Sequence, residues 1–173
     1  MQYFVYGRDR TGSGELKARL TPEHWAFMDG YADELIARGP TLTPDGEGTT
    51  GSLHIVDLPT FEAVKTFAYD EPYYRGGVFE SVLITRFDNH TGGTMWDFAN
   101  AVEGYQRYLV HTDDAPRPLS SPHIILYGDL LALDADDHLG RAVLLEAPDA
   151  VAAAALADAD LAQVHPWTFG GRR

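Results

Sequence analysis

An internal repeat constrains the fold of this chain more than any other feature. Residues 125–148 align on residues 36–59 without a gap, and residues 107–114 align on residues 2–9. Turn-forming residues keep their spacing across the repeat: Gly39/Gly128, Asp45/Asp134, Gly51/Gly140 and Pro59/Pro148. Near the end of the chain, Val82 and Phe87 match Val164 and Phe169. A repeat of this length predicts two copies of one supersecondary unit fused head to tail.

The first copy has the pattern of a βαββαβ module. Residues of high β-propensity predict strands at 2–7, 41–43, 51–58 and 78–87. A second helix is expected to open at Pro59-Thr60, because Thr and Pro are favoured at helix starts. Residues 88–103 are interpreted as a connector that Trp96 and Phe98 anchor. This order of elements is that of a ferredoxin-like module.

The first helix is predicted from its end signals. Thr21 is a good N-cap and Pro22 suits the first helical position, so the helix is expected to begin there. Apolar residues recur at helical spacing from Trp25 to Ile36, and Gly39-Pro40 is expected to end the helix. In the second copy this helix is shortened, because residues 115–124 take the place of residues 10–35.

The two copies are expected to cover each other. A ferredoxin-like sheet carries helices on one face only, so its other apolar face needs a partner. We therefore predict an α+β fold of tandem ferredoxin-like modules packed sheet to sheet, an intrachain pseudo-dimer. The predicted parts are a site-bearing module at 1–90, a connector at 91–103 and a degenerate module at 104–173. A monomer is expected, with a further homodimer left open.

Charge and composition exclude several classes of function. Thirteen basic against 26 acidic residues give a net charge of −13, which repels nucleic-acid phosphates and anionic lipid heads. The absence of cysteine excludes disulfides and thiolate chemistry. No signal peptide is recognised, and the longest apolar run, Ala150 to Ala157, is far below the ~20 residues that span a bilayer. We expect a cytoplasmic protein whose partner is a small molecule.

Several residues of the first half resemble the YCII-related family. That family has an Arg and a His opening the first helix, a Gly-Pro closing it and an Asp-Pro-Tyr run with a later Gly after the second helix. Here the matching residues are Arg19, His24, Gly39-Pro40, Glu71-Pro72-Tyr73 and Gly77. The resemblance covers residues 1–90 and departs at Glu71, where the family usually has Asp, and in a wider Arg19-to-His24 spacing. It implies a dimeric α/β-barrel with a His/carboxylate site in a cleft.

The candidate catalytic residues are His24 with Glu71 or Asp70. His24 would fall in the first turn of a helix that begins at Thr21, where the helix dipole disfavours imidazolium and a carboxylate favours it. Such a histidine suits a general acid or base. A surface or capping histidine and solvated loop acids are the alternatives. The candidate substrate-binding residues are Arg19, Tyr73, Arg75 and His54. Tyr73 could equally pack in the core, and a histidine on a strand such as His54 is more often a satisfied core residue than a ligand-binding one.

The leading hypothesis is a cofactor-free enzyme of small-molecule metabolism that performs elimination, isomerisation or hydrolysis. One branch of the resembled family is a dehydrochlorinase of a chlorinated hydroxyquinol, which makes elimination an option. The alternatives are a non-catalytic binding or accessory protein and a cofactor-independent monooxygenase-like barrel. No metal or nucleotide motif occurs in the sequence. The second copy has no counterpart of the Glu-Pro-Tyr run, so one site per chain is expected.

Overall fold

The computed structural model describes residues 1–171. Its first half contains β1 (Gln2–Asp9), α1 (Gly14–Asp29), β2 (Leu35–Leu42), β3 (Thr49–Asp57), α2 (Phe61–Asp70), α3 (Pro72–Arg75) and β4 (Phe79–Asn89). A short 3₁₀ helix, η1 (Met95–Asp97), lies in the connector. The second half contains β5 (Gln106–Thr112), β6 (Ile124–Leu131), β7 (His138–Ala147), α4 (Ala150–Ala157), η2 (Leu161–Gln163) and β8 (Val164–Pro166).

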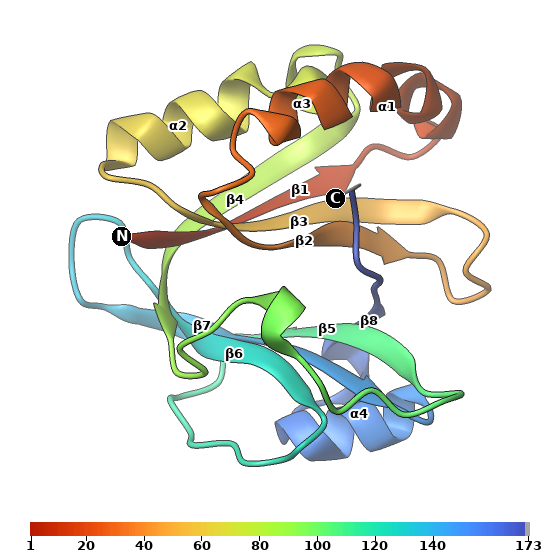
Figure 1. Cartoon of the computed structure of the whole chain (residues 1–173), viewed down its shortest axis with the longest axis vertical. Helices are drawn as coiled ribbons and strands as arrows, with labels where there is room; N and C mark the ends of the chain where they lie inside the picture. The colour runs from red at the N-terminus through yellow and green to blue at the C-terminus, as the bar shows by residue number, and fades with distance from the viewer. Residues whose placement is uncertain (172–173) are drawn as a thin grey trace.

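The strand order reproduces the repeat. Within residues 1–171 the strands form one eight-stranded sheet in the order β2-β3-β1-β4-β6-β7-β5-β8, so the order of the first four recurs in the last four. The sheet folds into two layers, with α1, α2 and α3 on the outer face of one and α4 on the outer face of the other (Figure 1). The predicted fold class, tandem ferredoxin-like modules packed sheet to sheet, is confirmed.

Strand registers match between the halves down to their irregularities. A break in register falls between Leu35 and Ala37 in β2 and between Ile124 and Leu126 in β6. A Cβ at Gly140 would lie 2.1 Å from the Thr112 carbonyl oxygen, which explains why glycine is needed there. The alignment of the last strand, however, is wrong by two residues. Val164 pairs with Val110 as Ile84 pairs with Val5, so Val164 corresponds to Ile84 rather than Val82.

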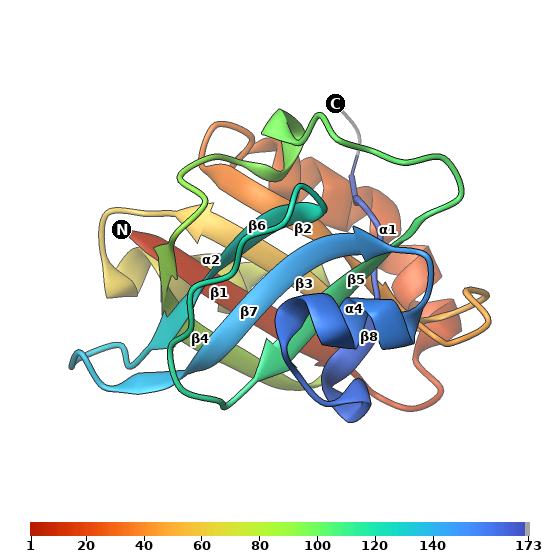
Figure 2. The same cartoon turned by 90° about the horizontal axis from the view of Figure 1, so that it is seen from below.

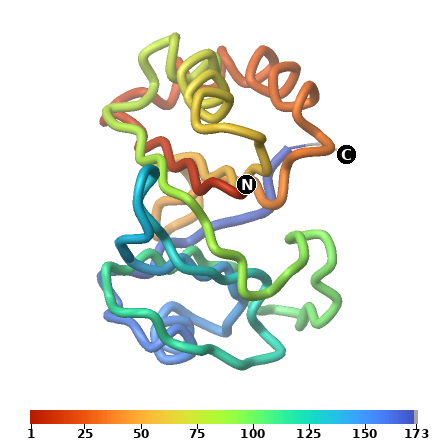
Figure 3. The backbone as a smooth tube through the Cα atoms, turned by 90° about the vertical axis from the view of Figure 1, so that its left-hand side faces the viewer, coloured from red at the N-terminus to blue at the C-terminus, as the bar shows by residue number. Residues whose placement is uncertain are grey.

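Apolar side chains form three layers. The middle layer lies between the two halves of the sheet and contains Phe4, Ile55, Phe87, Leu109, Leu144 and Trp167. Met28, Val56, Val64 and Phe67 fill the space between the first sheet half and its helices, and Val110, Val143, Ala153 and Ala157 do so under α4. Figure 3 shows the backbone of the two halves stacked one above the other, and Figure 2 shows the strands of the second half crossing those of the first.

The two halves join at both sides of the barrel. β4 pairs with β6 from Arg86↔Leu131 to Asn89↔Gly128. At the other side, Thr41 of β2 forms a β-bridge with Trp167, and the backbone N–H of Gly170 donates to the Arg38 carbonyl at 3.0 Å. The C-terminal segment therefore runs back onto the first half, as Figure 1 shows. The boundaries at residues 90 and 104 stay a prediction.

The first helix differs from the sequence prediction. It begins at Gly14 and ends at Asp29, so Pro22 lies inside it, and Leu35, Ile36, Gly39 and Pro40 belong to strand β2. An interior proline costs a helix about 3 kcal/mol. Packing of the α1 face that contains the buried His24 and Met28 offsets this cost. The predicted C-terminal end of the helix was wrong because Leu35 and Ile36 fit a helical and an extended period equally well.

Other elements follow the prediction closely. Thr60 caps α2, its hydroxyl accepting from the Ala63 N–H at 3.1 Å. Trp96 and Phe98 pack on the middle core, as expected of anchors in the connector. One expectation is wrong: no helix lies between β5 and β6, so the counterpart of α1 in the second half is missing rather than shortened. The buried Arg141 donates to the Ala157 and Asp158 carbonyls at the end of α4. Among the described residues, no helix is both long and apolar enough to cross a membrane.

Candidate functional site

A pocket of about 660 Å³ opens between α1 and the edge of the first sheet half. One wall is α1, which contributes Lys17, Thr21 and His24. The floor comes from β2 and β3, and a further wall comes from the C-terminal segment. The remaining lining residues include Arg38, Gly39, Glu47, Ser52, His54, Tyr73, Phe169 and Gly170. The pocket thus combines the first copy with the end of the second.

His24 and Glu71 form a buried pair. The Nδ1 atom of His24 contacts Oε1 of Glu71, and both side chains are almost fully buried. Glu71 is held by a second bond, because its Oε2 accepts from the Tyr74 backbone N–H at 3.0 Å. It is therefore the N-cap of α3, and the turn at Pro72 orients its carboxylate toward α1. A carboxylate at Nδ1 fixes the orientation of the imidazole and leaves Nε2 to meet a ligand.

Tyr73 lies flat against the histidine. Its ring stacks on the His24 ring at a centroid distance of 4.1 Å and an interplanar angle of 12°. The phenol shares a hydrogen bond of 2.9 Å with the Thr21 hydroxyl. Burial raises the pKa of Tyr73, and the bond to Thr21 partly opposes this. Tyr73 thus restrains the imidazole and presents a neutral phenol beside it.

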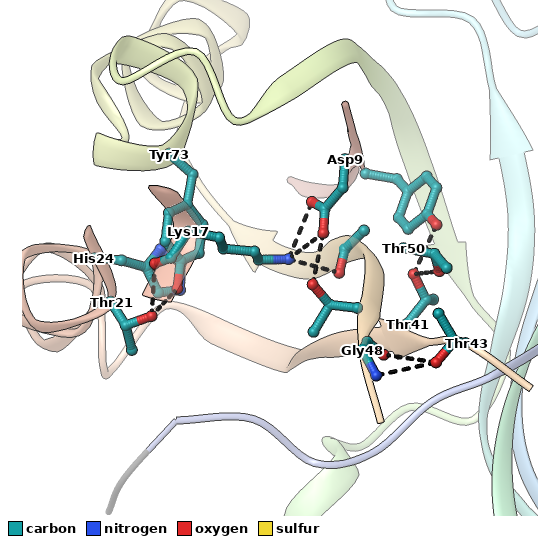
Figure 4. Close-up of polar contacts among 12 residues, drawn as sticks. Asp9, Lys17, Thr21, His24, Thr41, Thr43, Gly48, Thr50 and Tyr73 are labelled. Atoms are coloured by element: carbon teal, nitrogen blue, oxygen red, sulfur yellow. Dashed lines mark hydrogen bonds and ion pairs between the residues drawn. The ribbon is translucent and has the colours of Figure 1, made fainter. Parts of the chain in front are cut away.

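A second buried pair lies beside the first. The Nζ atom of Lys17 donates to both Asp9 oxygens, at 3.0 and 2.8 Å, and to the Gly51 carbonyl at 3.3 Å. The Thr49 hydroxyl also donates to Asp9, at 2.6 Å. Figure 4 shows Lys17 extending from α1 past Tyr73 toward Asp9. Burial lowers the pKa of Lys17, and the Asp9 carboxylate opposes this shift.

His54 enters the pocket from β3. Its ring lies 5.6 Å from that of His24 and meets Phe67 edge-on at 5.5 Å. Burial lowers the pKa of His54 well below 6.5, and His24, Arg38 and Lys17 lower it further. A neutral imidazole at this position can donate one hydrogen bond and accept another.

The structure brings some of the candidate residues together and leaves others outside. His24, Tyr73 and His54 line the pocket, and Glu71 contacts His24 from behind. Asp70, one residue before the α3 cap, instead pairs with Arg75 at 2.7 Å on the surface. Arg19 is exposed and does not line the pocket, because it is two positions from Lys17 and faces the other side of α1.

Sequence reasoning missed Lys17, Asp9, Arg38 and the C-terminal wall. A signal for Lys17 does exist, since Lys17, Thr21, His24 and Met28 follow one another at spacings of four, three and four residues, which is one face of a helix. Because the helix was predicted to begin at Thr21, Lys17 fell outside it and this face was not recognised. Arg38 and the C-terminal wall have no such local signal. Within residues 1–171, no cluster of three or more His, Cys, Asp or Glu side chains is arranged to hold a metal ion.

Comparisons with known proteins match the first half most closely. Residues 1–88 match the model of the YCII-related domain. Protein YciI of Escherichia coli O6:H1 and that of Shigella flexneri are each 32% identical over 94 residues, covering 50% of this chain and 96% of theirs. An uncharacterized protein of Haemophilus influenzae is 28% identical over the same coverage.

Two solved structures are similar in fold. The 5-chloro-2-hydroxyhydroquinone dehydrochlorinase of Burkholderia phenoliruptrix AC1100, in complex with 2,5-dihydroxybenzoquinone, matches with a TM-score of 0.50 at 24% identity, covering 54% of this chain and 99% of its own. A chlorite-dismutase-like protein matches 96% of this chain and 94% of its own, with a TM-score of 0.53 at 9% identity. The first resembles one copy, and the second resembles both copies together.

Proposed function

Because the chain belongs to the family of YCII-related proteins, we propose that it is a cofactor-free enzyme that moves a proton on a small molecule. The observation that carries the proposal is the buried contact of His24 with Glu71 at a pocket of about 660 Å³. A histidine with one nitrogen held by a carboxylate and the other open to a ligand is the arrangement of a general base. The reaction class is elimination, isomerisation or hydrolysis.

Glu71 has a defined part in this mechanism. As a carboxylate it accepts the Nδ1–H of His24, so the lone pair of the neutral ring is at Nε2. When Nε2 takes a proton from the substrate or from water, the resulting imidazolium lies against the carboxylate and its charge is balanced in a buried place. Tyr73 keeps the ring in this orientation by stacking on it. Asp70 has no part, because its carboxylate binds Arg75.

The proposal is tested by two assays on one panel of small molecules. Carbon acids are incubated with the protein in D₂O, and exchange of C–H for C–D is followed by NMR. Esters of 4-nitrophenol report hydrolysis through release of the coloured phenolate. We expect one of the two to proceed with the native chain and to slow by about 10²–10⁴-fold in His24→Ala, the usual contribution of a general base. Circular dichroism verifies that the variant is folded.

Two further variants sharpen the test. Glu71→Gln keeps the shape of the side chain, but its amide can donate to Nδ1 and would place the ring proton on Nε2, so the rate should fall as in His24→Ala. His90→Ala is the matched control, because His90 pairs with Asp129 away from the pocket and should leave the rate unchanged. Rates equal to buffer with every compound would favour the non-catalytic binding protein instead.

A further inference from the structure

The mechanism above makes no use of His54, although this side chain lies in the same pocket. His54 is 5% exposed, lines the pocket and has its ring 5.6 Å from that of His24. Its ring nitrogens form no hydrogen bond with the described residues. Neither nitrogen is completely covered by protein atoms. The polar atoms of His54 are therefore accessible from the pocket and available to a ligand.

The fold does not require a histidine at this position. In the register of the two halves, His54 of β3 pairs with Val5 as Val143 of β7 pairs with Val110. Val143 is completely buried in the apolar core under α4. The copy without a site has valine at the same strand position, so packing of the module does not require an imidazole there. We therefore relate the imidazole of His54 to the pocket.

We propose that His54 donates a hydrogen bond to a carbonyl oxygen of the substrate, next to the carbon from which His24 removes a proton. The substrate is then a small carbonyl compound with an acidic C–H, and the intermediate is its enolate. This inference rests on the proposed function, since it adds the group that receives the negative charge to the base that creates it. The two rings stand close enough for adjacent atoms of one ligand to reach both.

The electrostatic field at His54 suits this part. Lys17 and Arg38 lie near it, and their positive charges, together with His24, disfavour a proton on the ring beyond the effect of burial. A potential that opposes a positive charge on the ring favours a negative charge on an oxygen bound to it. The neutral ring keeps the N–H that such an oxygen needs.

The chemical step balances without any further reactant. The C–H bond breaks as the N–H bond forms at Nε2 of His24. The electron pair of the C–H bond becomes a C=C bond, and the π pair of the carbonyl moves to the oxygen at His54. Return of the proton to another carbon gives an isomer of the substrate, whereas loss of a leaving group from the neighbouring carbon gives an elimination product. In the isomerisation the imidazolium of His24 gives its proton to the second carbon. In the elimination the carbonyl reforms, the departing group leaves with its bonding electrons, and the imidazolium gives its proton to that group.

The experiment uses 4-nitrophenol, whose phenolate mimics an enolate oxygen and is visible by its absorbance. We expect the native chain to bind it as the phenolate at a pH where free 4-nitrophenol is largely protonated. His54→Val installs the residue of the second copy and should weaken binding by about 10- to 100-fold, the value of a hydrogen bond to a charged group. His54→Gln retains a donor and should recover most of the affinity.

His111→Val is the matched control. His111 lies on β5 against the ring of Phe4, outside the pocket, so its loss should not change binding. Three outcomes would overturn the inference, even if turnover that depends on His24 is found. They are absence of binding to the native chain, binding of 4-nitrophenol as the neutral phenol, and equal affinity in His54→Val. Phenolate binding that depends on His54 without any turnover that depends on His24 would overturn the proposed proton transfer and the enolate step with it.

Discussion

The two halves should unfold as one cooperative unit, because their sheets bury each other. The test is a pair of truncations at structurally equivalent positions, Phe87→Ala on β4 and Trp167→Ala just after β8. Phe87 is 5% exposed and Trp167 is 2% exposed, and both belong to the core between the sheets. Their correspondence follows from the shared register in which Ile84 and Val164 face Val5 and Val110.

The expected cost can be worked from burial. Truncation of a buried aromatic side chain to alanine costs about 3–5 kcal/mol. For a chain of this length each kcal/mol lowers the melting temperature by about 2–4 °C, so either variant should lose roughly 6–20 °C. Trp167→Phe should cost less than about 1.5 kcal/mol, since it keeps most of the volume. It also removes a buried indole N–H that has no acceptor among the described residues.

Thermal and urea unfolding, followed by circular dichroism and by tryptophan fluorescence, provide the assay. Both alanine variants should shift a single transition that the two signals report together. Leu139→Ala, a change at a 47% exposed side chain, is the control and should stay within about 0.5 kcal/mol of the native chain. Two separate transitions, with Phe87→Ala moving one and Trp167→Ala the other, would refute the idea that the sheets share one core.

Three further predictions concern charge and assembly. Lys17→Ala leaves the buried Asp9 carboxylate without its cation and should lower the free energy of unfolding in urea by about 3–5 kcal/mol. The double variant Lys17→Met with Asp9→Leu should recover most of this loss. Equal losses in the two variants would argue that the pair is not coupled. Burial holds the pKa values of His54, His111 and His165 below 6.5. As the pH falls below 6.5, the unfolded chain takes up protons that the folded chain does not, so stability should fall, and less steeply in His54→Val. Unfolding midpoints should not change with dilution, because the second copy covers the sheet; a dependence on concentration would show that another chain completes the core.

Much of the fold could be predicted because the residues that recur in the repeat are those that the backbone geometry requires. Gly51 and Gly140 keep their places since each lies where a side chain would strike a neighbouring strand. The boundaries of α1 and β2 could not be found this way. Thr21-Pro22 and Gly39-Pro40 are strong local end signals, yet packing carries the helix through Pro22 and sheet pairing draws Gly39 into β2. Tertiary contacts outweigh such local preferences, which amount to a few kcal/mol at most.

For the site, the sequence by itself determined the chemical groups, and the tertiary structure decided which of them meet. Residue types and the likeness to a family predict His24 with Glu71 or Asp70, although His24 lies in the interior of α1 rather than in its first turn. Only the fold distinguishes Glu71, which caps α3 and turns inward, from Asp70, which points to solvent and Arg75. The C-terminal wall depends on the chain returning to β2 from the far end of the sequence. No local pattern encodes such a contact, because it arises from how two distant segments pack.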